Sequence, residues 1–296
     1  MTTKTQRILS FDGGGIRGVF QSSFLSCLDD LPLVPQADLL AGTSTGAIIA
    51  TALALGILPK KLVEIYESLG KKIFNKKARW FRRHLMGDAS YSSDTLKAQL
   101  EEHLPKVKFG ECAKRVLIPA VSLNSWSPYI FDSSNPQDGS LSVVDVLLAT
   151  TAAPTYFKPH FINEERTTWV DGGLVCNNPS FEALHKLNKA PASIENIRVL
   201  SIGNGKHPAT HLPSSFMQKR PLRWALDVTE ICMNATSDES HIHCDQLLRK
   251  EHYIRINTFL GEKIALDDYA KALEILPALA RKEANENRQK IIEWLE

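Results

Sequence analysis

The sequence predicts a three-layer α/β fold, in which a central, mostly parallel sheet carries helices on both faces. Short apolar segments alternate with segments of helical periodicity along the chain, which is typical of α/β proteins. Two glycine-rich turns, at residues 12–18 and 42–46, each follow an apolar segment and precede a helix. The 296 residues, of which 43% are hydrophobic and 23% charged, are enough for one large domain with a buried core.

The predicted strands are short and apolar. In chain order they cover residues 7–11, 39–41, 116–122, 129–132, 168–171, 198–202 and 253–256. The predicted helices carry apolar residues at spacings of three and four. They cover residues 19–28, an apolar stretch after Gly46 that stops near Gly56, a helix from Pro59 through Leu69, and residues 93–104, 143–150, 180–188 and 277–295.

The domain organisation follows from the absence of a sharp change in composition. We expect a single domain over residues 1–296, with an inserted basic and aromatic segment near residues 70–90 and a mainly helical C-terminal extension over residues 206–296. Within the inserted segment, residues 71–84 hold seven Lys or Arg and no Asp or Glu, with three aromatic residues between them. This composition suits an anionic membrane surface, and the alternative is a solvated helix face with a few core aromatics.

Charge and cysteine usage exclude some classes of protein. Lys and Arg number 35 against 33 Asp and Glu, a net charge of +2, so no nucleic-acid partner is expected. The 5 cysteines form no C-x-x-C pair and predict no disulfide framework. The N-terminus lacks the apolar region of a secretion signal, and no apolar run approaches the roughly 18 residues of a membrane span. We expect a cytoplasmic protein that meets membranes only at their surface.

A nucleophile turn is predicted at residues 42–46, Gly-Thr-Ser-Thr-Gly, which match G-x-S-x-G between a strand and an apolar helix. Such a sharp turn strains the backbone of its serine and lifts the hydroxyl clear of the sheet. Gly42 and Gly46 supply the small residues needed where strand and helix pass closely. The N-terminus of the following helix favours developing negative charge. Ser44 is therefore the candidate nucleophile, and an ordinary turn is the alternative.

The glycine-rich loop at residues 12–18, Asp-Gly-Gly-Gly-Ile-Arg-Gly, exposes consecutive backbone N–H groups as an anion cradle. Preorganised donors of this kind stabilise the oxyanion that forms in ester hydrolysis. We expect Gly14 and Gly15 to be the donors of an oxyanion hole, with Gly13 beside them. Two interpretations stay open for Arg17: it orients the loop or meets a phosphate, or it is a solvated residue of the first helical turn.

The same loop also matches G-x-G-x-x-G, the fingerprint of dinucleotide-binding proteins, and Asp38 follows at the distance of a ribose-binding acid. That acid belongs at the carboxyl end of the second strand, whereas Asp38 precedes the strand at residues 39–41. A nucleotide-binding fold also has no use for a nucleophile turn after that strand. A dinucleotide-dependent oxidoreductase is therefore the disfavoured alternative.

The general base for Ser44 is expected to be an aspartate. Asp171 follows a predicted strand and precedes two glycines that allow close approach of another loop, although Asp-Gly-Gly is often a plain turn. A carboxylate beside Ser44 can act as base and then as acid. With an ordinary pKa of about 4, it would be a weaker base than histidine, and activity should fall only on the acid side. The histidines after Ser44 stand in uninformative contexts; they are His185, His241, His243 and His252.

A metal site is not expected. His241, His243, Cys244 and Asp245 are close in sequence, but adjacent residues on a helix point apart and no second cluster completes a tetrahedral site.

Taken together, the glycine loop, the turn at residues 42–46 and the Asp-Gly-Gly at residues 171–173 resemble the patatin-like phospholipase family, whose pattern has these segments in this order. Residues 149–157, Ala-Thr-Thr-Ala-Ala-Pro-Thr-Tyr-Phe, also resemble the family segment that precedes the catalytic aspartate. The resemblance spans residues 7–205. It implies a patatin-like fold and a Ser44–Asp171 dyad without histidine, with the oxyanion hole in the glycine loop.

By this resemblance, the protein is a lipid acyl hydrolase that cleaves carboxylic esters of membrane phospholipids through an acyl-enzyme, with no cofactor and no calcium. Some compact bacterial patatin-like proteins are effectors in antiphage defence that cyclic oligonucleotides switch on. We therefore expect a phospholipid membrane surface and a cyclic di- or oligonucleotide activator as partners. The alternative is a constitutive housekeeping lipase, and the oligomeric state stays open, with a dimer as one option.

Overall fold

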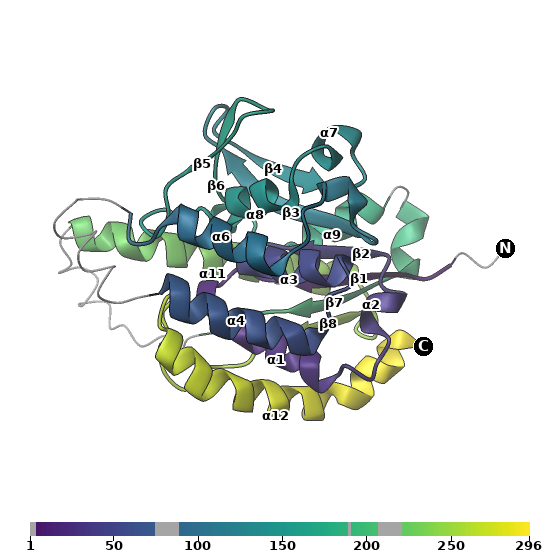
Figure 1. Ribbon diagram of the computed structural model, residues 1–296. Helices are drawn as coiled ribbons and strands as arrows, with labels where there is room; N and C mark the ends of the chain where they lie inside the picture. The colour runs from purple at the N-terminus through teal and green to yellow at the C-terminus, as the bar shows by residue number, and fades with distance from the viewer. Residues whose placement is uncertain (1–3, 75–88, 189–190, 207–220) are drawn as a thin grey trace.

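The computed structural model describes residues 4–74, 89–188, 191–206 and 221–296, and its centre is a mixed sheet (Figure 1). The strand order is β5-β6-β3-β2-β1-β7-β8, and β4 pairs with β3. Strands β3, β2, β1, β7 and β8 are parallel to one another in this order. The antiparallel pairs are β3 with β4, β3 with β6, and β5 with β6. The strands are β1 Gln6–Phe11, β2 Leu39–Gly42, β3 Arg115–Ser122, β4 Ser127–Asp132, β5 His160–Ile162, β6 Thr167–Asp171, β7 Ile197–Ile202 and β8 Tyr253–Ile256.

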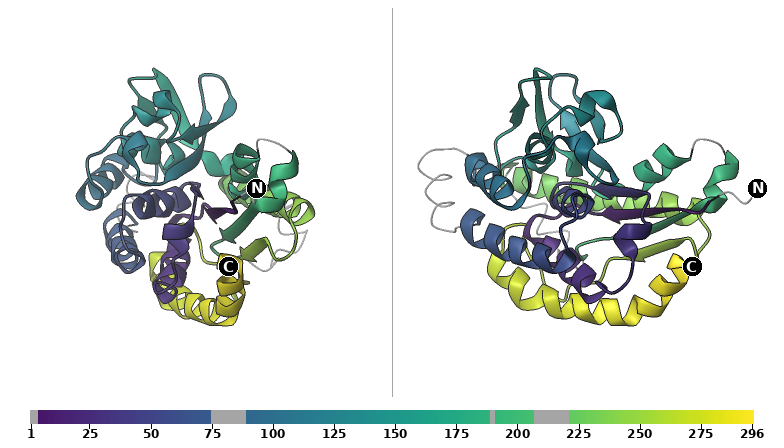
Figure 2. Two further views of the ribbon diagram at one scale, coloured as in Figure 1. Left: turned by 90° about the vertical axis from the view of Figure 1, so that its right-hand side faces the viewer. Right: turned by 45° about the vertical axis from the view of Figure 1, so that its right-hand side comes forward.

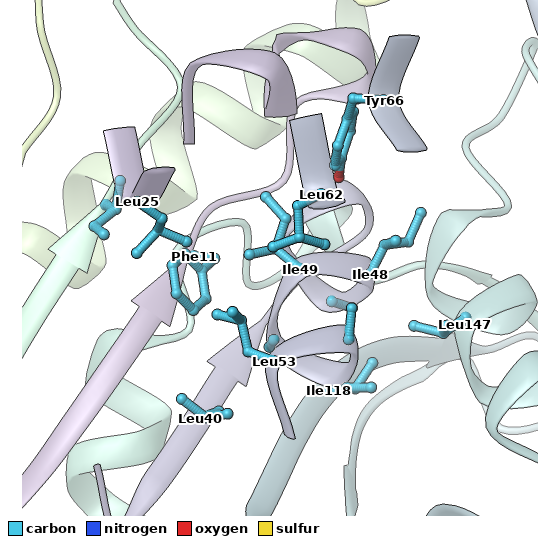
Figure 3. Packing of buried hydrophobic residues seen from close by; sticks show 14 of the residues in the cluster. Phe11, Leu25, Leu40, Ile48, Ile49, Leu53, Leu62, Tyr66, Ile118 and Leu147 are labelled. Carbon is cyan, nitrogen blue, oxygen red and sulfur yellow. The ribbon is translucent and has the colours of Figure 1, made fainter. Parts of the chain in front are cut away.

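Helices cover both faces of the sheet, as predicted (Figure 2). They are α1 Gly18–Cys27, α2 Leu33–Gln36, α3 Thr45–Ala54, α4 Pro59–Ile73, α6 Ser93–His103, α7 Pro136–Gly139, α8 Val143–Thr151, α9 Ser180–Leu187, α11 Pro221–Leu247 and α12 Tyr269–Leu295. Alternate side chains of β1 lie on opposite faces of the sheet. Leu9 and Phe11 pack in the core under α1 and α3, whereas Ile8 packs in the core under α9. Figure 3 shows Phe11 next to Leu53, in the core under α1 and α3.

Every predicted strand is present, with bounds that differ by at most two residues. The sequence reading missed β5, which has three residues, and it proposed no bounds for α11. The last helix was predicted to begin at Pro277, but α12 begins at Tyr269 and Pro277 lies inside it. A proline removes one helical hydrogen bond, but Leu276 and Ala280 on either side are fully buried, and this packing holds the helix together.

Strand β3 brings the carboxyl ends of two other strands together. One edge of β3 pairs with β4 over residues 117–122. The opposite edge is shared, because β2 pairs with residues 115–117 and β6 with residues 120–122. Since β2 is parallel and β6 antiparallel to β3, their carboxyl ends face each other beside residues 118–119. The segments that follow these two strands therefore meet at one point of the sheet.

Candidate active site

Ser44 lies in a strained turn between β2 and α3. Its backbone angles are φ 52° and ψ −118°, in a sparsely populated region that costs on the order of 1–3 kcal/mol for a residue with a side chain. A Cβ atom on Gly42 would lie 2.2 Å from the carbonyl oxygen of Gly46, and one on Gly46 would lie 2.2 Å from the carbonyl oxygen of Phe11. Both glycines therefore occupy the close approach that the sequence predicted.

The hydroxyl of Ser44 is in direct contact with the carboxylate of Asp171. Ser44 Oγ donates a hydrogen bond to Asp171 Oδ2 over 2.7 Å. The other carboxylate oxygen accepts the backbone N–H of Gly173, also over 2.7 Å, which fixes the orientation of the carboxylate. Ser44 is 6% exposed and Asp171 1% exposed, so the contact is shielded from bulk water. Hydrogen bonds in such surroundings are electrostatically stronger than in water.

Burial raises the pKa of the Asp171 carboxyl from 3.8 to about 6, and the hydrogen bonds from Ser44 and Gly173 offset only part of this effect. Removing a carboxylate from water disfavours its charged form. The expectation of an ordinary pKa is therefore wrong, because the sequence pattern does not reveal how deeply Asp171 is buried. A carboxylate with a raised pKa is also a stronger base.

The glycine loop passes beside Ser44, and its N–H groups differ in their partners. The N–H of Gly13 donates to the carbonyl oxygen of Asn177 over 3.0 Å, so Gly13 anchors the loop and has no N–H free for an oxyanion. Among the described residues, no acceptor faces the N–H groups of Gly14 and Gly15. Gly15 lines the same cavity as Ser44 and Asp171. The candidate oxyanion donors are therefore reduced to Gly14 and Gly15.

Asn204 and Arg17 are among the side chains that hold the glycine loop in place. Asn204 Nδ2 donates to the carbonyl oxygen of Gly13. Arg17 is only 2% exposed, and its Nε donates to the carbonyl oxygen of Gly14 over 3.4 Å. The solvated interpretation of Arg17 is therefore wrong, and the contact with Gly14 favours a role in orienting the loop.

The hydroxyl of Ser44 and the carboxylate of Asp171 face an apolar cavity. Tyr66 contributes its ring, and its hydroxyl is satisfied by the carbonyl oxygen of Thr45 at 2.8 Å. The remaining apolar wall consists of Ile16, Ile48, Leu69, Ile73, Phe74, Leu96, Ala153, Tyr156, Phe157, Met233 and Leu266. Such a wall has the chemistry to hold a hydrocarbon chain next to the hydroxyl of Ser44.

A model of the family described as patatin-like phospholipase matches residues 9–184, more than half of the chain. The matched stretch includes the glycine loop, Ser44 and Asp171. The chain belongs to the patatin-like phospholipase family. It is accordingly a phospholipase, a hydrolase of lipid esters.

Similar proteins include two bacterial ones named cGAMP-activated phospholipase. The protein from Escherichia coli (strain TW11681) is 32% identical over 298 residues, which cover 92% of this phospholipase and 80% of the relative. The one from Vibrio cholerae serotype O1 is 31% identical over 291 residues, which cover 88% and 81%. Among solved structures, VipD from Legionella pneumophila matches 93% of this chain and 67% of its own, at 12% identity and a TM-score of 0.48.

The residues of the alternative interpretations lie elsewhere. No histidine of the described part of the phospholipase lines the cavity. His241 Nδ1 lies 3.1 Å from the hydroxyl of Tyr253, and Cys244 is fully buried. In the same described part, no three His, Cys, Asp or Glu side chains gather as metal ligands would. Asp38 accepts the backbone N–H of Arg7 at 2.9 Å, at the start of β1 and β2.

The predicted basic and aromatic segment falls mainly on residues 75–88, outside the described residues. Its first residues end α4, and Phe74 lines the cavity. None of the described helices combines the length and the apolar composition that crossing a bilayer requires.

Sequence reasoning missed several residues of the site. Met233 reaches the cavity from α11, and Tyr66 reaches it from α4. Thr150 bonds to the turn of Ser44 from α8. Helical periodicity marks such residues as core residues and cannot show that their side chains end at a cavity or a turn. The only sequence signal was the resemblance of residues 149–157 to a family segment.

Proposed function

We propose that this phospholipase cleaves the carboxylic esters of membrane phospholipids through a dyad of Ser44 and Asp171. The observation that carries the proposal is the 2.7 Å hydrogen bond from Ser44 Oγ to Asp171 Oδ2 beside an apolar cavity. A nucleophile and a base within this distance need no rearrangement before proton transfer.

The proposed reaction has two halves. Ser44 Oγ attacks the ester carbonyl carbon while Asp171 takes its proton, and the N–H groups of Gly14 and Gly15 stabilise the resulting oxyanion. The C–O bond to the lysolipid then breaks, and Asp171 returns the proton to the leaving oxygen. In the second half, Asp171 removes a proton from water, which attacks the acyl-enzyme. The fatty acid leaves as Ser44 recovers the proton from Asp171.

The cavity supports an acyl chain as the bound part of the substrate. Its wall is mainly aliphatic and aromatic, and its polar side chains are those of Ser44, Thr45, Tyr66, Thr151, Tyr156 and Asp171. Burial of a methylene group in such a wall contributes about 0.8 kcal/mol. This binding energy would hold the ester against Ser44 while the headgroup stays outside the cavity.

The test of the dyad compares Ser44→Ala and Asp171→Asn with the wild-type protein on phospholipid vesicles. The activity of each variant should be at least about 10³-fold below that of wild type. The groups that remain can still bind the substrate and stabilise the oxyanion, but they cannot supply both the nucleophile and the base. A fluorophosphonate probe should label the wild-type protein at Ser44. Ser140→Ala and His241→Ala are controls, at a surface serine and at an alternative base. Loss of activity in His241→Ala with retention in Asp171→Asn would contradict the dyad.

A cyclic nucleotide is the second part of the proposal: we infer that it activates this phospholipase. The support is the name of the relatives that are 31–32% identical over most of the chain. The antiphage role expected from the family resemblance depends on this activation. Purified protein should hydrolyse vesicle phospholipid only after cGAMP is added, and a panel of other cyclic nucleotides tests selectivity. Equal activity without any nucleotide would instead support a constitutive lipase.

Action at a membrane surface is the third part. Vesicle flotation with and without anionic lipid tests it, and cGAMP is present in both arms. The proposal expects the protein to float with the vesicles, and more strongly when anionic lipid is present. Protein that stays at the bottom of both gradients would contradict it.

A further inference from the structure

A gap in strand pairing lies on β3 where β2 and β6, the strands that lead to Ser44 and Asp171, both end. On the edge of β3 that β2 and β6 share, β2 stops pairing at residue 117 and β6 starts at residue 120. The carbonyl group of Pro119 falls in this gap and has no ladder partner there. Because proline has no N–H group, the carbonyl oxygen is the only backbone group of Pro119 that requires a hydrogen-bond partner.

Thr150 fills this gap from α8. Its hydroxyl donates to the carbonyl oxygen of Pro119 over 2.6 Å, and its Oγ1 accepts the backbone N–H of Ser44 over 3.0 Å. The side chain is completely buried. The strained backbone of Ser44 belongs neither to a strand nor to a helix, so its N–H depends on this acceptor.

The neighbouring threonine shows what an ordinary helical threonine does. The hydroxyl of Thr151 donates to the carbonyl oxygen of Leu147, four residues earlier in the same helix, over 2.7 Å. This back-bonding is the usual pattern for a buried threonine in a helix. Thr150 departs from it, because both of its hydrogen bonds go to other elements.

The end of α8 also holds the other member of the dyad. The backbone N–H of Asp171 donates to the carbonyl oxygen of Ala152 over 3.1 Å. One helix end therefore contacts Ser44 through Thr150 and Asp171 through Ala152. The position of Ser44 relative to Asp171 depends on both contacts.

We propose that Thr150 is a positioning residue, whose hydroxyl holds the strained turn so that Ser44 Oγ lies within hydrogen-bond distance of Asp171. The inference rests on the proposed dyad and deepens it. Removing the hydroxyl frees the N–H of Ser44 and the carbonyl of Pro119 together. Displacements of about 1 Å at a reacting atom cost on the order of 10²-fold in rate.

The experiment compares Thr150→Val, which keeps the shape and lacks the hydroxyl, with Thr150→Ser, which keeps the hydroxyl. Vesicle hydrolysis and the rate of fluorophosphonate labelling are measured, with cGAMP present. Thr150→Val should lose about 10–100-fold in kcat and in labelling rate, with KM within about threefold of wild type. Thr150→Ser should stay within about threefold of wild type in all three quantities.

Thr51→Val is the matched control for loss of a buried hydroxyl. Thr51 lies in α3, is fully buried and has no hydrogen-bond partner for its hydroxyl among the described residues. Its variant should keep the wild-type kcat. If Thr150→Val does not fold, Thr150→Cys replaces it, because a thiol is a weak donor and acceptor, and it must show the same loss.

The outcomes separate this inference from the proposed dyad. If Ser44→Ala and Asp171→Asn keep their activity, the dyad itself is wrong. If both are inactive while the folded Thr150→Val or Thr150→Cys variant matches wild type, the dyad stands and the positioning role is overturned. Equal losses in Thr150→Val and Thr150→Ser would also overturn it, since the hydroxyl would then be irrelevant.

Discussion

The guanidinium of Arg255 forms a bidentate salt bridge with the carboxylate of Asp12. The distances are 2.6 Å from Nη1 to Oδ1 and 2.5 Å from Nη2 to Oδ2. The two side chains are 8% and 3% exposed. Ser237 of α11 adds a hydrogen bond to Asp12 Oδ2 over 2.7 Å. Asp12 is the first residue of the glycine loop, so the salt bridge ties this loop to β8 and the hydrogen bond from Ser237 ties it to α11.

Arg255→Met should destabilise the protein strongly. The substitution leaves the buried carboxylate of Asp12 without its cationic partner, which typically costs about 3–5 kcal/mol. Urea denaturation at pH 7 measures the free energy of unfolding. The exposed pair of Lys61 and Glu64, whose side chains are 57% and 64% exposed, supplies the control, since Lys61→Met should change stability by less than about 0.5 kcal/mol.

The double variant Asp12→Asn/Arg255→Met tests the cause of that loss. It removes the unpaired charge, so it should be more stable than Arg255→Met alone. A double variant that is as unstable as the single one would show that packing, and not an unpaired charge, explains the effect.

The activity of this phospholipase, measured with cGAMP present, should rise with pH through about 6. In the proposed mechanism Asp171 must be ionised to accept the proton of Ser44, and burial raises its pKa to about 6. At pH 5, where about nine-tenths of such a group is protonated, kcat/KM should be about tenfold below its plateau. A pH series of kcat/KM from 4.5 to 8 measures the midpoint. A midpoint near 4 would contradict the effect of burial.

Asp171→Asn should be more stable than wild type at pH 7, although the proposed mechanism expects it to be inactive. The folded-state pKa of Asp171 lies above its ordinary value of 3.8, at about 6. The folded protein therefore keeps a proton that the unfolded chain has lost, and wild-type stability falls as pH rises from about 4 to about 6. The variant lacks this ionisation, so its advantage should grow over that window by about 2–3 kcal/mol.

Denaturation of both proteins at pH 4 and pH 7 gives this comparison. An advantage of Asp171→Asn that is the same at both pH values would argue against a raised pKa in the folded protein.

Gly46→Ala should remove activity and destabilise the fold. Its Cβ would lie 2.2 Å from the carbonyl oxygen of Phe11, a backbone atom that cannot move without shifting β1. Overpacking of this kind costs about 1–3 kcal/mol. Gly261→Ala is the control, because its Cβ would meet nothing within 4 Å. Thermal unfolding of the two variants should separate them clearly, and equal melting temperatures would show that the turn tolerates a side chain.

Local patterns predicted much of the fold and of the site. The strand at residues 39–41 and the turn at residues 42–46 were readable, because a G-x-S-x-G turn is defined by steric demands within five residues. The end of β6 at Asp171 was readable because an apolar strand there runs into two glycines. The start of α12 was not, because its first turns, with Pro277 inside the helix, are held by packing. Periodicity alone cannot report that packing.

The sequence by itself determined which groups are present: a hydroxyl in a strained turn, a carboxylate after a strand and a run of glycine N–H groups. These follow from backbone angles and side-chain sizes of adjacent residues. Only the tertiary structure decided that Gly13 donates its N–H to Asn177 while Gly14 and Gly15 do not, that Thr150 accepts the N–H of Ser44, and that burial raises the pKa of Asp171 to about 6. Hydrogen-bond partners and desolvation depend on residues that are distant in the chain, and folding alone brings those residues together.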